Sequence, residues 1–569
     1  MNTLYYGDNL KILREYIKDE SVDLVYLDPP FNSNRNYNVL FRNESGAEAE
    51  SQITAFEDTW HWNLAAEETY HELINEPDQV GRMIESFRQF IGNNQMMAYL
   101  VMMAVRLKEL HRVLKPTGSL YLHCDPTASH YLKILLDTIF GAQNYQNEIV
   151  WKRTNAHSDS KQGNVLHFGR IHDDILYYTK TSVATRNDLF LPYSKEYLDS
   201  FYKFADEKGR YQLGDLSGPG GAAKGNAYYE FLGVTRYWRF SKVKMQELYD
   251  QGLIVQTKPG TVPRFKRYLD ETKGVPMQDV VDDLMTLNMP KSETLGYPTQ
   301  KPVALLERII QASSNEGDVV LDPFCGCGTT IAAAQKLKRE WIGIDITHLS
   351  VGLQKLRLKD SFGLTALTQS QADKYKGELP PDTYKVVGQP EDFAGAKELA
   401  EKDKYGFQWW VLPLIGAKAF GSEAGKKQGK KGADGGIDGM IVFTDDNSGK
   451  SKKVIVSVKG GHVNVAQIRD LGHVIDRENA AIGIFLTLEA PTRPMNEEAV
   501  AKGFYHSPGW NKDYARIQIL TVEDILNGKQ PDLPPNLQTF KQGRKVLPEG
   551  DTQASLFDEA RNERLDPEF

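Results

Sequence analysis

The chain has 569 residues, which is too many for a single hydrophobic core and predicts about three or four folding units. A hydrophobic content of 40% and a charged content of 25% are typical of a soluble globular protein, and no apolar run is long enough to span a bilayer. Because the first residues also lack the pattern of a signal peptide, we expect a cytoplasmic protein without membrane contact. The net charge of −8 excludes a globally basic nucleic-acid-binding protein, so any nucleic-acid partner must meet local basic surfaces.

The first predicted elements are a strand at residues 3–6, an amphipathic helix and a strand at residues 22–27. The second strand ends in the tetrad Asp28-Pro29-Pro30-Phe31. Open α/β sheets bind their ligands at this end of a strand; here the prolines stiffen the turn, Asp28 offers an acceptor and Phe31 offers a flat apolar face. A purely structural proline turn is the alternative interpretation. A second strand end of the same kind in this chain favours a binding site.

That second strand end carries a glycine-rich turn. Residues 319–321 predict a buried parallel strand, which is followed by Asp322, a turn and a helix-forming stretch. Gly326 and Gly328 lack side chains where a ligand would approach backbone N–H groups. The next predicted strand ends in Asp345, an acid placed to bond ribose hydroxyls. The pattern indicates a nucleotide-type cofactor site, although glycines that serve only packing would look the same.

These motifs resemble those of a known enzyme family. The tetrad at residues 28–31 resembles the catalytic motif of amino-methyltransferases that act on DNA, and residues 322–328 resemble their S-adenosylmethionine motif. The order of the two motifs resembles the circularly permuted β class. Further stretches that fit the class are Gly7-Asp8, residues 118–125, residues 147–151 and residues 298–302. The resemblance covers about residues 1–360.

The resemblance implies an α/β fold: a Rossmann-like, S-adenosylmethionine-dependent methyltransferase domain with an inserted target recognition domain. It implies that Asp28, Pro29, Pro30 and Phe31 transfer the methyl group to the exocyclic amine of a base flipped out of double-stranded DNA. An aspartate at the head of the tetrad favours adenine N6, whereas cytosine-N4 enzymes more often have serine there. The cofactor-binding residues that it implies are Gly7, Asp8, Thr299, Gln300, Lys301, Asp322, Phe324, Gly326, Gly328, Thr329 and Asp345.

Aromatic and basic residues alternate between the two motif groups, as in Arg236-Tyr237-Trp238-Arg239. Lysine and arginine can hold phosphates, and aromatic and arginine side chains can reach bases. Composition alone leaves a solvated α+β insertion equally open. The position of the stretch within the class favours target recognition.

A second resemblance lies after about residue 390. An acid precedes the predicted strand at residues 440–443, a hairpin follows, and a lysine stands at the end of the next predicted strand, residues 454–458. This layout resembles that of PD-(D/E)xK nucleases and Mrr-like restriction endonuclease domains. It implies that Asp438 ligates Mg²⁺ and that Lys459 lies beside the attacking water and the scissile phosphate. Glu423 could supply a further metal-binding carboxylate. Ser457, however, stands where the pattern usually has Glu, Asp or Gln, and serine is a poor metal ligand.

The predicted segments are residues 1–181, the first part of the methyltransferase core; residues 182–284, the recognition insertion; residues 285–365, the second part of the core; residues 366–389, a linker; residues 390–535, the restriction-endonuclease-like domain; and residues 536–569, a polar tail.

Three hypotheses follow for the whole chain. The leading one is a single-chain restriction-modification protein that combines methyltransferase and Mg²⁺-dependent endonuclease. The second keeps the methyltransferase but makes the C-terminal domain a non-cleaving DNA-binding module. The third is a methyltransferase acting on RNA or a small molecule. We expect no ATP-driven motor, because the sequence contains no ATPase motif: residues 448–451 resemble part of a phosphate loop but lack its partner glycine. A homodimer is possible.

Overall fold

The computed structural model describes residues 2–30, 62–155, 168–286, 293, 300–419, 436–445 and 451–535. They form two compact units, one from Met1–Arg186 with Asp279–Phe569 and an inserted one, Asn187–Gln278. Three residues with predicted roles, Phe31, Thr299 and Glu423, lie outside the described residues. Across the described residues, no helix is long and apolar enough to cross a membrane.

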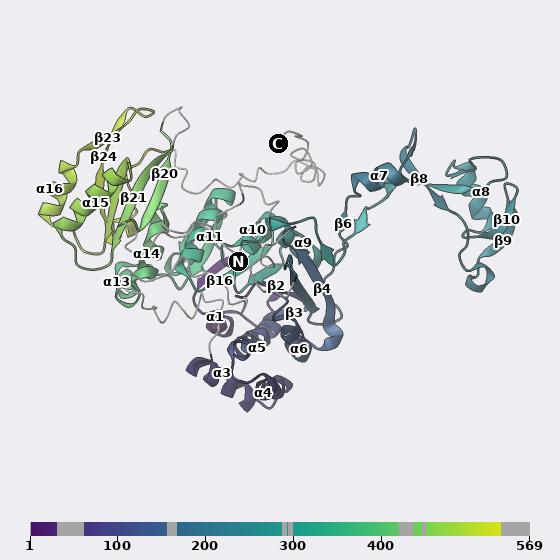
Figure 1. The fold of residues 1–569 in the computed structure, drawn as a ribbon, viewed down its shortest axis with the longest axis horizontal. Coiled ribbons are helices and arrows are strands. Elements are labelled where there is room, and N and C mark those ends of the chain that lie inside the picture. Colours follow the sequence, from purple (N-terminus) through teal and green to yellow (C-terminus); the bar gives the residue numbers. More distant parts are fainter. Residues whose placement is uncertain are drawn as a thin grey trace. The chain divides into compact units, whose positions relative to one another are not determined.

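The first unit is built on a large sheet at its centre (Figure 1). Among the described residues its ten strands follow the order β14-β4-β5-β3-β2-β15-β16-β1-β18-β17. Neighbouring strands from β3 to β17 along this order run parallel, and β5 is antiparallel to β3 and β4. The strands are β1 Thr3–Tyr6, β2 Val22–Leu27, β3 Leu114–Cys124, β4 Tyr145–Lys152, β5 His172–Thr179, β14 Val280–Val281, β15 Val319–Asp322, β16 Glu340–Asp345, β17 Thr365–Thr368 and β18 Thr383–Val387.

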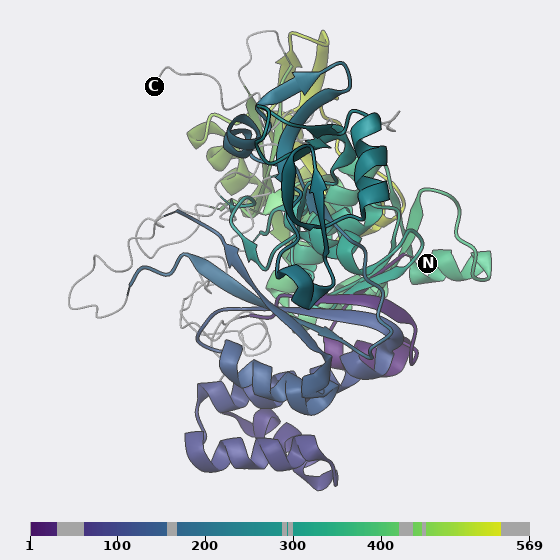
Figure 2. The same ribbon diagram turned by 90° about the vertical axis from the view of Figure 1, so that its right-hand side faces the viewer.

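Side chains of the central strands alternate between two apolar cores. Val25 and Leu27 of β2 belong to the core under α1, α5 and α6, whereas Leu24 and Tyr26 belong to the core under α9, α10 and α11. In Figure 1 the first group of helices lies below the sheet and the second lies above it, and Figure 2 shows α3 and α4, in purple, on the side of α5 and α6 that faces away from the sheet. The helices are α1 Asn9–Tyr16, α3 Leu64–Asn75, α4 Gln79–Ile91, α5 Gln95–Val113, α6 Ser129–Phe140, α9 Val303–Ser313, α10 Thr329–Lys336, α11 His348–Phe362 and α12 Gln369–Ala372. The Rossmann-like α/β fold predicted from the sequence is confirmed.

The predicted linker at residues 366–389 needs correction, because β17 and β18 extend the sheet beyond β1. Tyr384 and Val386 of β18 are buried in the core while Lys385 between them is half-buried, which is the alternation of a strand. The polar residues between the two short strands hid this pattern in the sequence. At the other end of the core, β14 lies inside the predicted insertion but pairs with β4 of the large sheet.

The inserted unit has its own small core, formed by Leu216, Phe231, Trp238, Met245, Leu248 and Ile254. Its described residues form a sheet in the order β11-β12-β8-β7, the hairpin β9–β10 and the strand pair β6–β13. The elements are β6 Phe190–Leu191, α7 Lys195–Phe201, β7 Phe204–Asp206, β8 Gly209–Asp215, β9 Ala227–Phe231, β10 Val234–Trp238, α8 Lys242–Asp250, β11 Ile254–Val255, β12 Arg264–Tyr268 and β13 Val275–Pro276.

The C-terminal module, residues 390–535, contains a second sheet in the order β19-β20-β21-β22-β25 within its described residues. The sheet is covered by α13, α14 and α17 on one face and by α15 and α16 on the other. Two separate helices, α13 and α14, precede the main strands of the module, because Asp403 between them adopts an extended conformation and caps α14. The elements are α13 Phe393–Lys402, α14 Lys404–Val411, β19 Lys418–Ala419, β20 Gly439–Phe443, β21 Lys452–Lys459, α15 Val465–Arg477, β22 Ile482–Thr487, α16 Arg493–Ala501, β23 Phe504–Ser507, β24 Lys512–Ala515, β25 Ile517–Thr521 and α17 Val522–Leu526.

Candidate cofactor and catalytic site

The carboxyl ends of three neighbouring strands meet at one edge of the large sheet. β15 pairs in parallel with β2 on one side and with β16 on the other. Asp28 directly follows β2, and Asp322 and Asp345 are the last residues of β15 and β16. Three carboxyl groups predicted to have separate roles therefore lie at the same edge, where open α/β sheets bind their ligands.

Asp345 is buried and bonded on both carboxyl oxygens. Oδ2 accepts the N–H of Gly326 at 2.8 Å, and Oδ1 accepts the N–H of Thr347 at 2.9 Å and its hydroxyl at 3.0 Å. Burial raises the pKa of Asp345 to about 6 despite these hydrogen bonds. The acid predicted to meet ribose hydroxyls thus also anchors the glycine turn.

Asp322 is buried beside the other two acids. Burial raises the pKa of Asp322 to about 7, and the nearby carboxyl groups of Asp28 and Asp345 act in the same direction. One oxygen accepts the N–H of Phe324 at 3.0 Å, which shapes the start of the turn. A site with this concentration of carboxyl groups favours a positively charged ligand.

Side chains of α11 bind the glycine turn through hydrogen bonds. Gln354 Nε2 donates to the carbonyl of Gly326 at 2.7 Å, and Arg357 Nη1 donates to the carbonyl of Cys327 at 3.2 Å and to the hydroxyl of Thr329 at 3.3 Å. Gly328 has a φ of +76°, and a Cβ atom there would lie 2.8 Å from Gln354 Cγ. A left-handed backbone and close packing against α11 therefore require glycine at this position.

The turn between β1 and α1 joins the same edge. Gly7 N–H donates to the carbonyl of Asp345 at 3.0 Å, and Asp8 caps α1 by accepting the N–H groups of Leu10 and Lys11. Asn9 Nδ2 donates to the Pro323 carbonyl at 2.8 Å. The turn that carries Gly7 and Asp8 is thus hydrogen-bonded to the end of β16 through Gly7, and the adjoining Asn9 bonds to the motif at residues 322–328.

At the tetrad predicted to be catalytic, Asp28 forms an ion pair with Lys301, which comes from the segment before α9. Pro29 is buried and Pro30 is half-buried. The side-chain amide of the neighbouring Gln300 donates to the carbonyl of Glu293 at 2.8 Å. The structure therefore places Lys301, predicted as a cofactor-binding residue, against Asp28, which is predicted to be catalytic.

The residues that support the site from neighbouring helices were not predicted from the sequence. Asn9, Arg106, Gln354 and Arg357 all bond to its turns. The available signal was Arg106, a single charge within the apolar stripe of α5 that is buried in the fold. The other three carry no local pattern that separates them from surface residues.

The candidate nuclease site of the C-terminal module is arranged differently. Asp438 Oδ2 accepts the N–H of Val458 at 2.6 Å and the hydroxyl of Ser457 at 3.3 Å. Ser457 is buried on β21, and Lys459 is the half-buried last residue of that strand. Across the described parts of the chain, no group of three His, Cys, Asp or Glu side chains could hold a metal ion.

An open α/β sheet with a glycine turn and acids at its strand ends defines an enzyme domain that holds a nucleotide-type cofactor. Residues 22–351 match the DNA methylase family N6_N4_Mtase. Because this match covers more than half of the chain, the protein belongs to that DNA methylase family.

Several curated proteins are similar to this chain. Type II methyltransferase M.EcaI of Enterobacter cloacae is 28% identical over 348 residues, which are 60% of this chain and 66% of M.EcaI. The StyLTI Mod subunit, a Type III restriction-modification enzyme of Salmonella typhimurium, is 27% identical over 356 residues, 60% of this chain and 50% of the subunit. DNA adenine methyltransferase YhdJ of Escherichia coli is 24% identical over 381 residues, 65% of this chain and 88% of YhdJ. The chain thus matches between half and two thirds of the length of the first two relatives.

The C-terminal module matches a different family. Residues 420–527 are similar to NACHT-associated inactive Restriction Endonuclease 1. The resemblance to a restriction-endonuclease domain is therefore supported only in its coarse form, and the family that matches is described as inactive.

Proposed function

We propose that this protein transfers a methyl group from S-adenosylmethionine to an exocyclic amine in double-stranded DNA. The target is adenine N6, because aspartate heads the tetrad and one relative is named a DNA adenine methyltransferase. Cytosine N4 is the alternative, since the name of the matched family covers both positions.

The observation that carries the proposal is the shared edge of β2, β15 and β16. It brings the Asp28-Pro29-Pro30 turn next to the turn that begins at Asp322, although they are far apart in the sequence. A methyl donor and a methyl acceptor must meet within bonding distance, so the cofactor turn and the catalytic turn must be neighbours.

The residues around the glycine turn suit S-adenosylmethionine. Asp8 and Asp345 offer carboxylates for the amino and hydroxyl groups of a nucleoside, and the acids Asp28 and Asp322 suit a nearby cation. The cofactor, when bound, supplies a methyl group on positively charged sulfur. The remaining chemistry must come from the residues of the chain.

An exocyclic base nitrogen is a poor nucleophile because its lone pair is delocalised into the ring. The Asp28 carboxylate and the Pro29 carbonyl would accept its two N–H groups and thereby draw the lone pair out of conjugation. The base must first be flipped out of the duplex, at a cost of a few kcal/mol. The ion pair with Lys301 would orient the Asp28 carboxylate during this step.

Incubation of the full chain with duplex DNA and labelled S-adenosylmethionine, followed by mapping of the modified base, tests this function. We expect N6-methyladenine at a fixed sequence. Label on cytosine N4 would select the alternative, and label in RNA but not in DNA would contradict the proposal.

We further propose that the C-terminal module does not cleave DNA. Two observations support this: Ser457 stands where the pattern usually has Glu, Asp or Gln, and Oδ2 of Asp438, the predicted metal ligand, accepts hydrogen bonds from Val458 and Ser457. A nuclease of this kind needs a divalent cation to activate water.

Calorimetric titration of the full chain with Mg²⁺ and Mn²⁺ tests this part. We expect the same weak signal from the wild type and from Asp438→Asn. A binding event that disappears in Asp438→Asn would contradict a non-cleaving module and favour the fused endonuclease predicted from the sequence.

A further inference from the structure

A buried arginine holds the turn that carries Gly7 and Asp8. The Arg106 side chain on α5 is only 6% exposed. Its Nη2 donates to Asp8 Oδ2 at 3.0 Å, and its Nε donates to Asn9 Oδ1 at 2.6 Å. Nη1 completes the fork by donating to the carbonyl of Met102 at 2.9 Å. The three nitrogens of this guanidinium thus bond to the start of α1 and to the backbone of α5, and fix the two relative to each other.

Asn9 extends this contact to the cofactor turn. Its side-chain oxygen accepts from Arg106, so its NH₂ group points to the carbonyl of Pro323 at 2.8 Å. Pro323 follows Asp322 in the glycine-turn motif. If Arg106 were absent, the Asn9 amide would lose the partner that sets its orientation, and Asp8 would lose its cationic partner.

We propose that Arg106 is a positioning residue for the cofactor site. It aligns the Asp8 carboxylate directly and the Pro323 carbonyl through Asn9, without itself touching cofactor or DNA. The inference rests on the proposed function, because the ligand whose binding it controls is S-adenosylmethionine.

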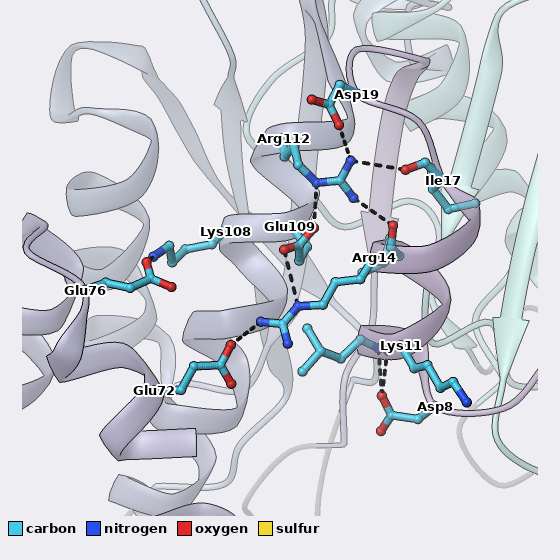
Figure 3. A network of polar contacts seen from close by, with 12 residues as sticks. Asp8, Lys11, Arg14, Ile17, Asp19, Glu72, Glu76, Lys108, Glu109 and Arg112 are labelled. Carbon is cyan, nitrogen blue, oxygen red and sulfur yellow. Dashed lines mark hydrogen bonds and ion pairs between the residues drawn. The ribbon is translucent and has the colours of Figure 1, made fainter. Parts of the chain in front are cut away.

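The same helix provides a matched control in Arg112. This guanidinium donates to the carbonyl of Leu13. It also donates to the carbonyl of Ile17 and pairs with Asp19, as Figure 3 shows. These contacts hold the C-terminal end of α1, whereas Asp8 stands at its N-terminal end (Figure 3). Removing either arginine takes several buried or half-buried hydrogen bonds from the contact between α1 and α5. Of these two arginines, Arg106 bonds to Asp8 and Asn9 beside the cofactor turn, whereas the contacts of Arg112 lie at the other end of α1.

The first experiment compares wild type, Arg106→Met and Arg112→Met as full chains by calorimetric titration with S-adenosylmethionine, alongside their thermal midpoints. We expect both variants to melt at lower temperature. Arg106→Met should bind the cofactor about tenfold more weakly, while Arg112→Met should bind it like the wild type. Equal affinities for all three proteins, or equal losses in both variants, would overturn the inference. A wild type that binds no S-adenosylmethionine would instead overturn the proposed function.

A second experiment tests the route through Asn9. Asn9→Ala and Arg106→Met are combined and the cofactor affinity of the double variant is measured. Because both changes release the same carbonyl, we expect a combined loss smaller than the product of the single losses. Losses that multiply would show that Arg106 acts independently of Asn9. Arg106→Lys, which keeps the charge but not the fork, gives a milder variant if Arg106→Met does not fold.

Discussion

The carboxyl edge of the large sheet and the β20–β21 hairpin of the C-terminal module each contribute an aspartate and a lysine to a candidate site. At the first, Asp28 pairs with Lys301, and two further buried acids, Asp322 and Asp345, accept backbone N–H groups of the glycine turn. At the second, Asp438 accepts hydrogen bonds from the backbone and the serine of the adjacent strand. An aspartate at a strand end therefore indicates chemistry only when other elements bring it ligand-binding partners.

The largest effect that would test this comparison is loss of methyl transfer in Asp28→Ala. Removing the acceptor for the amine should lower the transfer rate by about a thousandfold and leave S-adenosylmethionine binding in place. The measurement is a single-turnover assay with labelled cofactor, combined with calorimetric titration.

Asp23 supplies the matched control, because it also lies on β2 and pairs with a lysine, Lys115, but at the opposite end of the strand. Asp23→Ala should keep the wild-type transfer rate once it is folded. Transfer that survives in Asp28→Ala, or is lost equally in both variants, would contradict the assigned role of Asp28.

A smaller effect concerns stability and pH at the acid-rich edge. The pKa of Asp322 is raised from 3.8 to about 7, so the folded protein binds this proton more tightly than the unfolded chain does. Its contribution to stability is present in full below pH 3.8 and is lost as the pH rises to about 7.

We therefore expect the free energy of unfolding of Asp322→Asn to depend less on pH than that of the wild type, by at most about 1.4 kcal/mol per pH unit. Urea unfolding at closely spaced pH values between 5 and 8 measures the difference. Parallel curves for the two proteins would show that Asp322 ionises normally.

The smallest effect concerns the second site. Ser457→Asp would place a carboxylate next to Asp438, and the pair should gain affinity for a divalent cation. In thermal melts, millimolar Mn²⁺ should raise the midpoint of Ser457→Asp by a few degrees more than that of the wild type. Ser457→Asn is the uncharged control. Equal shifts in all three proteins would mean that the serine is not what prevents metal binding.

The architecture of the methyltransferase core could be predicted from sequence because its signals are local. An apolar run followed by Asp28-Pro29-Pro30, and another followed by Asp322, each mark a buried parallel strand that ends in a turn. The short strands β17 and β18 could not be found this way, because they pair with each other and join the large sheet where β18 pairs with the distant β1.

The residues that hold the turns of the site could not be predicted either, because their contacts also join distant parts of the sequence. Arg106 bonds to Asp8 and Asn9 across 98 and 97 positions of the sequence, and the Lys301–Asp28 pair spans 273. No local pattern encodes such contacts, since they arise from the packing of α5 and of the segment before α9 against the sheet edge. The stretch from Asp438 to Lys459 has the spacing of a nuclease motif, but in the fold Asp438 accepts hydrogen bonds from Ser457 and Val458. Here a local pattern was recognised, and the contacts of its residues could not be read from it.

The most direct test of the account is one incubation of the full chain with unmethylated plasmid, S-adenosylmethionine and Mg²⁺, followed by base mapping and gel electrophoresis of the same sample. We predict methylated adenine at a fixed sequence and plasmid that stays intact. Discrete fragments that disappear in Lys459→Ala, or intact plasmid without any methylated base, would contradict the contrast between the two sites.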